Sequence, residues 1–341
     1  MNDLTVVTGG AGFIGSHLVE LLVDRGDRVR VVERPEARVE HLPAGVEIFR
    51  ADIRDRESLK HAFEGARSVY HLAANPNLWV RDRREFDAVN HRGTIHVLDQ
   101  ARDSGAERIL HASTESILTR AKQTAPIGAD IHISPKDTVG PYCLSKLLAE
   151  NEAIARGRAG EPIVVVNPTM PVGPGDRGLS PPTRLILDCA LGNLPAIMDC
   201  TLNLIDVRDI ALGMIKAVEI GRPGRRYLLG GTNLTLIELL NKVAERTGSR
   251  VPKVRVPYAV GLAFAYASEF WADYATGKSP RATVTGVKLT RRTMHFDASE
   301  SLAELGIAPR PIDRSIDDEI DWLSAEGIIS IFKTKEHSIS S

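Results

Sequence analysis

Cysteine is scarce in this chain, and its spacing suits neither a metal site nor a disulfide framework. The three cysteines are Cys143, Cys189 and Cys200, an odd number with no close pair. Such usage is typical of reduced thiols. We therefore expect no metal site and a cytoplasmic location.

The chain also lacks an excess of charge of one sign. Lysine and arginine together number 43 against 44 aspartates and glutamates, which gives a formal net charge of −1. A nucleic-acid backbone or an anionic membrane is attracted by a basic field, and this balance provides none. We expect a small-molecule substrate as the partner, and no nucleic acid.

Long hydrophobic runs are missing as well. The N-terminus leads directly into a β-type segment instead of a charged and then apolar leader, so no secretory signal is expected. The uncharged stretch Val256–Ser268 is shorter than the ~20 residues that a spanning helix requires. The sequence therefore predicts no membrane-spanning helix.

Short β-branched runs do recur, and helical patterns separate them. With 341 residues, 43% of them hydrophobic, the chain can bury one large α/β domain and a smaller companion. This alternation predicts a Rossmann-type, doubly wound parallel sheet. The expected strands are Leu4–Thr8, Val29–Val32, Val46–Phe49, Ser68–Leu72, Arg108–Ala112 and Ile163–Val166, with Arg226–Leu229 returning to the same sheet.

The alternation stops in the proline- and glycine-rich stretch Asn167–Gly175, for which we expect no regular structure. A part that covers the substrate is expected to begin there. Because a later strand returns to the large sheet, this second, smaller C-terminal domain is expected to be discontinuous. The expected division is a dinucleotide-binding domain over 1–170 with a return around 200–230, a substrate domain mainly over 171–330, and a polar tail over 331–341.

A glycine-rich turn follows the first expected strand. Its spacing, Gly10-x-Gly12-x-x-Gly15, can place a dinucleotide pyrophosphate on a helix N-terminus, although a tight turn without a ligand is the alternative. Glu33, at the end of the second strand, suits a ribose-binding acid and favours NAD. Its neighbour Arg34 could bind a 2′-phosphate, so NADP stays possible. Asp52 is expected either to contact the adenine or to cap a helix.

Tyr142 and Lys146 lie one helical turn apart, after a strand that ends near Thr114. A phenol with a pKa of about 10 is a poor base near neutral pH, but a nearby ammonium and an oxidised nicotinamide favour the phenolate. Tyr142 could then take an alcohol proton while hydride leaves the carbon, with Thr114 bonded to the same oxygen. The alternative is an ordinary surface pair on an amphipathic helix.

Together these segments resemble the extended short-chain dehydrogenase/reductases, also called the NAD-dependent epimerase/dehydratase family. The resemblance implies an NAD(P)-dependent epimerase or dehydrogenase/reductase with Thr114, Tyr142 and Lys146 as catalytic residues. It also implies a homodimer formed by the helices that contain Asn90 and Tyr142. The matching motifs are Thr8 to Gly15, Asp52-Ile53-Arg54-Asp55, His71-Leu72-Ala73-Ala74, Asn90 to Thr94, Ser113-Thr114, Tyr142 to Lys146 and Asp206-Val207-Arg208-Asp209.

By the same resemblance, the cofactor-binding residues follow these motifs along the carboxyl edge of the sheet. They are Gly9, Gly12, Phe13, Ile14, Gly15, Glu33, Arg34, Asp52, Ile53, Leu72, Ala73, Ala74, Asn90, Tyr142, Lys146 and Pro168.

Individual positions bear on the reaction. Sugar-nucleotide 4,6-dehydratases of the family carry Asp-Glu after the catalytic Thr, where this chain has Glu115-Ser116, so dehydration is not expected. The arginine that clamps a diphosphate in other members is replaced around Leu202-Asn203, although Arg291 and Arg292 could substitute. Other segments resemble hopanoid-associated sugar epimerases and dihydroflavonol-4-reductase-like proteins. Sugar epimerisation and net reduction, as in hydroxysteroid dehydrogenases, both stay open; the alternative is a non-catalytic dinucleotide-binding redox sensor.

The substrate-facing residues are less sharply indicated. Trp79 could wall the pocket or simply pack, and we add Glu115 and Asn167 as substrate candidates. The aromatic stretch Val256–Trp271 is consistent with an apolar lid over a lipid-like substrate or with a segment of core.

Overall fold

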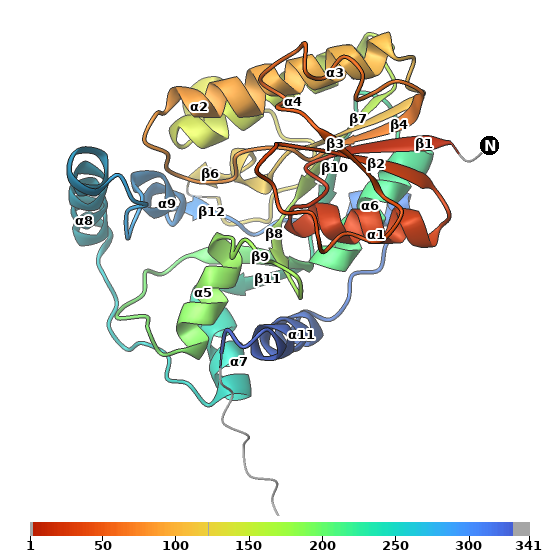
Figure 1. The fold of residues 1–341 in the computed structure, drawn as a ribbon. Helices are drawn as coiled ribbons and strands as arrows, with labels where there is room; N and C mark the ends of the chain where they lie inside the picture. The colour runs from red at the N-terminus through yellow and green to blue at the C-terminus, as the bar shows by residue number, and fades with distance from the viewer. Residues whose placement is uncertain (1–2, 122, 330–341) are drawn as a thin grey trace, which may run out of the picture.

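A seven-stranded parallel sheet forms the centre of the molecule (Figure 1). The structure, a computed structural model, describes residues 3–121 and 123–329. The strand order is β10-β7-β5-β4-β1-β2-β3. All seven expected strands are present, with ends shifted by at most two residues, which confirms the Rossmann-type fold. They are β1 (Leu4–Thr8), β2 (Arg28–Glu33), β3 (Glu47–Arg50), β4 (Ala66–His71), β5 (Arg108–Ala112), β7 (Ile163–Pro168) and β10 (Arg226–Leu229).

Helices cover both faces of this sheet because successive strand residues point to opposite sides. Val7 belongs to the core under α1 (Phe13–Asp24) and α6 (Val207–Ile220), whereas its neighbour Val6 belongs to the core on the opposite face. The helices that cover this opposite face are α3 (Gly93–Asp103) and α4 (Gly140–Arg158), and the short α10 (Ser299–Leu305) packs on β10. Four short helices contact α4: α2 (Arg84–Phe86), the π-helical η1 (Asp87–Arg92) and the 3-10 turns η2 (Glu115–Ile117) and η3 (Pro135–Asp137).

Strand order reverses between β1 and β4, which lie side by side in parallel. In open α/β sheets, ligands bind at such a switch point, outside the carboxyl ends of the strands. The glycine-rich turn follows β1 at this edge, and the segment Leu72–Ala74 follows β4. The fold therefore brings two of the predicted cofactor segments together.

A smaller sheet, of order β11-β9-β8, lies beside the large one (Figure 1). The expectation that 167–175 is irregular was wrong: β7 runs on to Pro168, and Met170–Val172 forms β8. Pro171 is tolerated because β8 is an edge strand, where a missing N–H costs no ladder bond. The remaining strands are β9 (Thr201–Asp206) and β11 (Thr232–Thr235), and the helices around this sheet are α5 (Pro181–Ala190), α7 (Leu236–Thr247) and α11 (Ile312–Ala325).

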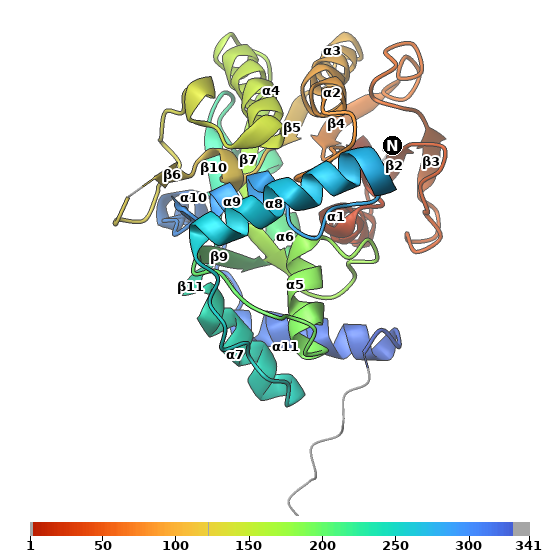
Figure 2. The same ribbon diagram turned by 90° about the vertical axis from the view of Figure 1, so that its left-hand side faces the viewer.

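A third group of elements borders the first two. It consists of the two-stranded pair β6 (Arg120–Ala121) and β12 (Arg292–Thr293), the helices α8 (Tyr258–Trp271) and α9 (Val284–Leu289), and the π-helical η4 (Ala272–Thr276). Figure 2 shows α8 in front of the rest of the chain, at the outer side of the molecule. Of the two interpretations of Val256–Trp271, a core segment is excluded because α8 keeps large apolar side chains exposed.

None of the helices in the described ranges is both long and apolar enough to cross a bilayer. The expected tail over 331–341 lies outside the described residues.

Candidate active site

The glycine-rich turn is shaped by contacts that leave no room for side chains. Gly9 has a left-handed φ of 73°, and an added Cβ there would lie 2.7 Å from the Ala73 nitrogen. A Cβ on Gly15 would lie 2.2 Å from the Gly9 carbonyl oxygen. Gly12 caps α1 without a side-chain hydrogen bond. The first amides of a twelve-residue helix are thus presented to a ligand through a backbone that can be approached closely.

Phe13 and Ile14 open this helix. The Phe13 ring meets the His17 ring at a centroid distance of 6.1 Å, and Ile14 packs on the core beneath the sheet. The Leu72 side chain joins that same core, while Ala73 packs on the opposite one. Phe13, Ile14, Leu72, Ala73 and Ala74 are all half-buried. The turn and the end of β4 thus form one continuous rim.

Glu33 and Arg34 differ in direction. The Glu33 carboxylate accepts a hydrogen bond of 2.9 Å from the Ala11 amide, so it lies against the glycine turn, and burial raises its pKa. Arg34 is exposed. The carboxylate, and not the guanidinium, is therefore the group held at the turn.

Asp52 lies after β3, where its carboxylate accepts a 2.9 Å bond from the Arg54 amide and pairs with the Arg54 guanidinium, an interaction that lowers its pKa. This is a local turn and ion pair. Ile53 is buried against Gly93, at the start of α3.

Asn90 is fully buried in η1 and connects three segments. Its side chain accepts from the Asn75 amide at 2.7 Å and donates to the Asn75 carbonyl at 3.1 Å and to Ser145 of α4 at 3.2 Å. The π-helical geometry around Asn90 has no signal in the sequence, although single π turns occur often at functional sites.

A chain of buried hydrogen bonds supports the same rim. The Thr94 hydroxyl donates to the Asn90 carbonyl at 2.7 Å, so it accepts from His71 Nε2 at 2.9 Å. His71 Nδ1 then accepts from Thr8 at 2.7 Å. Burial lowers the pKa of His71 to about 3, which keeps the ring neutral.

Three polar side chains gather just after β5. The Thr114 hydroxyl lies 2.7 Å from the Ser116 hydroxyl and donates to Glu115 at 3.0 Å. Burial raises the pKa of Glu115 to about 7. The residue pattern did not indicate Ser116; the only available signal was its place two residues after Thr114.

Tyr142 lies in the first turn of α4, with its ring edge-on to Phe86 at 6.2 Å. Burial raises the pKa of its phenol, the charge of Glu115 adds to this, and hydrogen bonding to Thr114 and Ser116 partly offsets it. The sequence argument expected the ammonium of Lys146 and an oxidised nicotinamide together to favour the phenolate. In the structure this ammonium donates to the Ala112 carbonyl at 2.7 Å, and burial raises the pKa of the phenol.

Lys146 is buried as well, and burial lowers its pKa to about 8. The opposing influence is Glu150, one turn further along α4, whose charge favours the ammonium. Glu150 is itself fully buried and pairs with Arg226 of β10. The sequence analysis missed both residues, which lie 76 positions apart.

Asn167 and Pro168 end β7 at this edge, and both are buried. The side-chain nitrogen Nδ2 of Asn167 donates to the Thr114 carbonyl at 3.0 Å and to the Glu150 carboxylate at 2.6 Å. Through these contacts, Asn167 connects the backbone of Thr114 with the buried carboxylate of Glu150.

Trp79 is nearly enclosed, at 8% exposed. Its indole N–H donates to Asp273 of η4 at 3.1 Å, and the Arg83 guanidinium lies 5.2 Å from the ring centroid. The tryptophan therefore connects the loop after β4 with the segment that carries α8.

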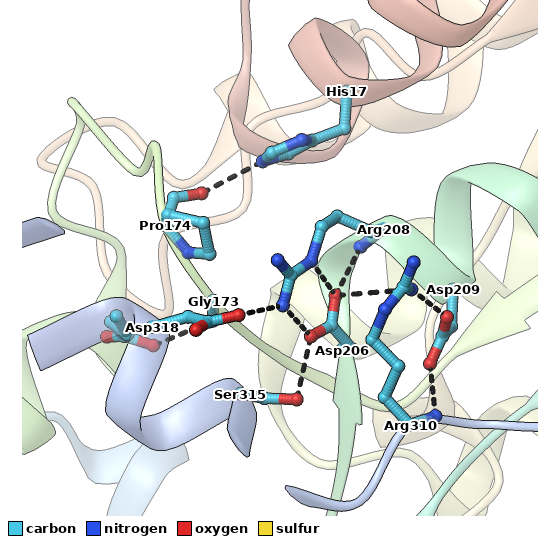
Figure 3. Close-up of polar contacts among 10 residues, drawn as sticks. His17, Gly173, Pro174, Asp206, Arg208, Asp209, Arg310, Ser315 and Asp318 are labelled. Carbon is cyan, nitrogen blue, oxygen red and sulfur yellow. Dashed lines mark hydrogen bonds and ion pairs between the residues drawn. The ribbon is translucent and has the colours of Figure 1, made fainter. Parts of the chain in front are cut away.

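The last motif of the resemblance, around Asp206, forms a charged network with residues of α11 and of the segment before it (Figure 3). Asp206 caps α6 and binds the Arg208 guanidinium at 2.6 Å and the Ser315 hydroxyl at 2.7 Å. Arg208 also pairs with Asp318 of α11 at 2.6 Å. Because α6 packs on the large sheet and α11 packs on the small one, these ion pairs and hydrogen bonds connect the two sheets.

A cavity of about 530 Å³ lies in the smaller part of the molecule, and its lining includes Arg255, Arg291 and Arg292. All three arginines have partners. Arg255 pairs with Asp199 at 2.8 Å, Arg291 lies 4.5 Å from the Tyr258 ring centroid, and Arg292 donates to the Asp137 carbonyl at 3.0 Å. A free diphosphate clamp is therefore not preformed there.

The fold, the glycine turn and the polar cluster beside it together define a nicotinamide-dependent oxidoreductase of the extended short-chain type. A model of the NAD dependent epimerase/dehydratase family matches residues 5–230. The chain belongs to this family, whose cofactor is NAD.

Two curated relatives extend over almost the whole chain. This chain is 33% identical over 335 residues to a putative dihydroflavonol 4-reductase of Synechocystis sp. The alignment covers 96% of this chain and 97% of the relative. The chain is 30% identical over 330 residues to sterol demethylase protein B of Methylococcus capsulatus, with 95% and 99% covered.

Solved structures agree on the fold. The crystal structure of gox2253 superposes with a TM-score of 0.85 at 34% identity, covering 96% of this chain and all of that one. The Thermus thermophilus UDP-glucose 4-epimerase in complex with NAD gives a TM-score of 0.74 at 24% identity, with 94% and 99% covered.

The residues of this chain fit such a cofactor. Side chains at Gly9 and Gly15 would collide with backbone, so the turn keeps its amides open to a pyrophosphate. The Glu33 carboxylate, held against that turn, suits a ribose hydroxyl pair. These two features would hold the dinucleotide along the switch point.

Proposed function

We propose that this chain transfers hydride at a secondary alcohol or its ketone, with Tyr142, Thr114 and Lys146 as the catalytic residues. NAD, when bound, supplies the hydride acceptor or, in its reduced form, the donor. The observation that carries the proposal is the hydroxyl cluster of Tyr142, Thr114 and Ser116 after β5, together with the buried Lys146, whose ammonium donates to the last residue of that strand. A redox sensor would need none of these groups.

In the direction of ketone reduction, Tyr142 donates its phenol proton to the carbonyl oxygen. The raised pKa of the phenol keeps this proton in place near neutral pH. The Thr114 hydroxyl turns its single hydrogen from Glu115 to the same oxygen and holds that oxygen in position. Lys146, whose ammonium donates to the Ala112 carbonyl, would hold the nicotinamide ribose when the cofactor is bound.

We propose an apolar substrate in place of a nucleotide sugar. Asn203, where other family members carry the diphosphate clamp, donates to Asn233 at 2.7 Å and accepts from the Gly231 amide at 2.9 Å, so its side chain is occupied. Phe86 packs edge-on against the Tyr142 ring within a buried hydrophobic cluster, so the surroundings of the phenol are apolar. The names of the two curated relatives, putative dihydroflavonol 4-reductase and sterol demethylase protein B, agree with this class.

The test is to denature purified protein, identify any released nucleotide by mass spectrometry, and then assay alkyl, flavonoid and steroid ketones with NADH. An exchangeable site and NADH-dependent reduction of an apolar ketone are the expected results. Stoichiometric bound NAD with interconversion of UDP-sugars, and no net use of NADH, would instead establish an epimerase.

We further propose a cytoplasmic homodimer that pairs through the helices containing Asn90 and Tyr142, which are η1 with its continuation α3, and α4. Supporting features are the free thiols of all three cysteines and the exposed Leu144 on α4. We also propose that the cofactor domain over 1–170 regains the segment around 200–230, since β10 completes the large sheet. Sedimentation velocity measures the dimer directly.

A further inference from the structure

The helix α8 and the π-helical turn η4 that continues it are amphipathic, but their charged side chains face the rest of the molecule and their large apolar side chains are exposed. Asp273 accepts from the Trp79 indole and pairs with Arg83 at 3.1 Å, and Glu269 accepts from the Val284 amide at 2.7 Å. In a water-exposed helix of a globular protein, the polar residues would face out.

The outward face is apolar and aromatic. Its large members are all more than half exposed, and none is charged: Val260 at 58%, Phe264 at 53%, Tyr266 at 54%, Phe270 at 63%, Trp271 at 64% and Tyr274 at 79%. Alanines at 259, 263, 267 and 275 fill the exposed positions between them. This helix lies at the left edge of the molecule in Figure 1 and in front of the other elements in Figure 2. A contiguous apolar surface of this kind marks a contact with another phase or molecule.

Basic residues flank this face. Residues 251–292 contain seven lysines and arginines and two acids, and both acids are the inward-pointing Glu269 and Asp273. Over the described part of the chain, no carboxylate lies within ion-pair distance of Lys253, Lys278 or Arg281. The net charge of −1 suggested that the chain has no attraction for an anionic surface, but the charges are unevenly distributed, and this segment is strongly basic.

We propose that the outward face of α8 and η4 docks on the surface of an anionic lipid bilayer, with the helix lying in the plane of the interface. Tryptophan, tyrosine and phenylalanine are the side chains that favour the boundary between headgroups and acyl chains. Lysines and arginines in the segments before and after this helix add attraction for anionic headgroups, about fivefold in affinity for each basic side chain that comes close to the surface. A second copy of the chain fits less well, because pairing two such faces would bring two basic rims together.

The docked face lies next to the candidate site. The inward side of α8 and η4 holds Trp79 and Arg83, which follow β4 at the switch point. Gly140, at the start of the helix with Tyr142, lies against Thr285 of α9, and α9 packs on α8. Docking would thus orient the site toward the bilayer, where an apolar substrate resides. That consequence depends on the proposed function, whereas the docking itself does not.

The test is sedimentation of the full chain with vesicles of phosphatidylcholine, alone or in equal parts with phosphatidylglycerol. The expected result is at least about tenfold tighter binding to the anionic vesicles, weakened by added salt. The triple variant Phe264→Ser, Phe270→Ser, Trp271→Ser should lose about tenfold or more of this binding. Leu191→Ser with Ile220→Ser, at exposed apolar positions elsewhere, is the matched control and should bind like the wild type.

A second readout does not depend on the folding of the triple variant. The emission of Trp271, obtained as the difference between the wild type and Trp271→Phe, should shift to the blue when anionic vesicles are added. Equal binding to both kinds of vesicle, or an unchanged Trp271 emission, would overturn the proposal. So would a triple variant that binds vesicles normally but changes the oligomeric state in sedimentation velocity, since the face would then be an interface between copies. NADH affinity is measured in parallel, so failure of docking and failure of the cofactor site are distinguished.

Discussion

The side-chain nitrogen Nδ2 of Asn167 donates a hydrogen bond of 2.6 Å to the carboxylate of Glu150, and both side chains are fully buried. The same nitrogen donates to the Thr114 carbonyl. The other carboxylate oxygen of Glu150 pairs with Arg226. One buried carboxylate thus connects the end of β7, the strand β10 and the turn that carries the hydroxyl cluster.

Replacing Glu150 by glutamine should lower the free energy of unfolding by about 3–5 kcal/mol, because it leaves the guanidinium of Arg226 without a charged partner in a largely buried place. Urea denaturation measures the change. The double variant Glu150→Gln, Arg226→Met removes both charges and should recover much of the loss. A single variant as stable as the wild type would show that the pair does not contribute.

The carboxyl group of Glu115 should give the reaction its pH dependence near neutrality. Its pKa is about 7, and its negative charge raises the pKa of Tyr142. As the pH rises through 7, the phenol therefore holds its proton more tightly, and ketone reduction should slow. In Glu115→Gln this descending limb should be absent from the profile of kcat/KM against pH. An unchanged limb in the variant would assign the titration to another group.

A buried imidazole with no hydrogen-bond partner should make the fold sensitive to acid. Within the described residues neither ring nitrogen of His111 has a hydrogen-bond partner, and the ring centroids of His111 and His71 lie 5.4 Å apart. Burial lowers the pKa of His111 far below the value of about 6.5 that it has in the unfolded chain. The unfolded chain therefore takes up a proton below pH 6.5 and the folded protein does not, so stability present above that pH is lost as the pH falls.

His111→Leu should remove this contribution. We expect the variant to be at least as stable as the wild type at pH 7 and to gain on it by about 1.4 kcal/mol for each pH unit below 6.5. Thermal or urea unfolding at pH 7 and pH 5 provides the comparison. A variant that loses stability at both pH values would indicate that His111 is needed for packing.

The central sheet could be predicted from the sequence because inner strands such as β1 and β7 are buried on both faces and carry β-branched runs. The edge strand β8 could not, since Pro171 signals a loop and only the neighbouring β9 makes a strand possible there. The orientation of α8 was equally hidden. An apolar helix looks the same in sequence whether its apolar face meets a core or points away from the molecule.

At the candidate site, local motifs were readable and long-range partners were not. Thr114, Tyr142 and Lys146 were found from spacing and resemblance. Glu150 and Arg226 were missed, because their pairing depends on β10 lying next to β7. The protonated state of Tyr142 also follows from burial, which no spacing reveals.

The Glu33 carboxylate should determine the choice of dinucleotide. Glu33→Ser removes the charge that opposes a 2′-phosphate, so the ratio of NADPH to NADH affinity should rise by about tenfold or more. Fluorescence titration with both nucleotides measures the ratio. Glu36→Ser, at an exposed acid three residues away, is the control and should leave the ratio unchanged. An equal response of both variants would mean that only the overall charge matters.

The most direct measurement is the rate of hydride transfer in Tyr142→Phe, followed in a single turnover with an apolar ketone and bound NADH. If Tyr142 donates the proton, this rate should fall by about 10²–10⁴-fold while the NADH affinity and the thermal unfolding temperature stay close to those of the wild type. A variant that reduces the ketone at the wild-type rate would contradict the assignment of Tyr142.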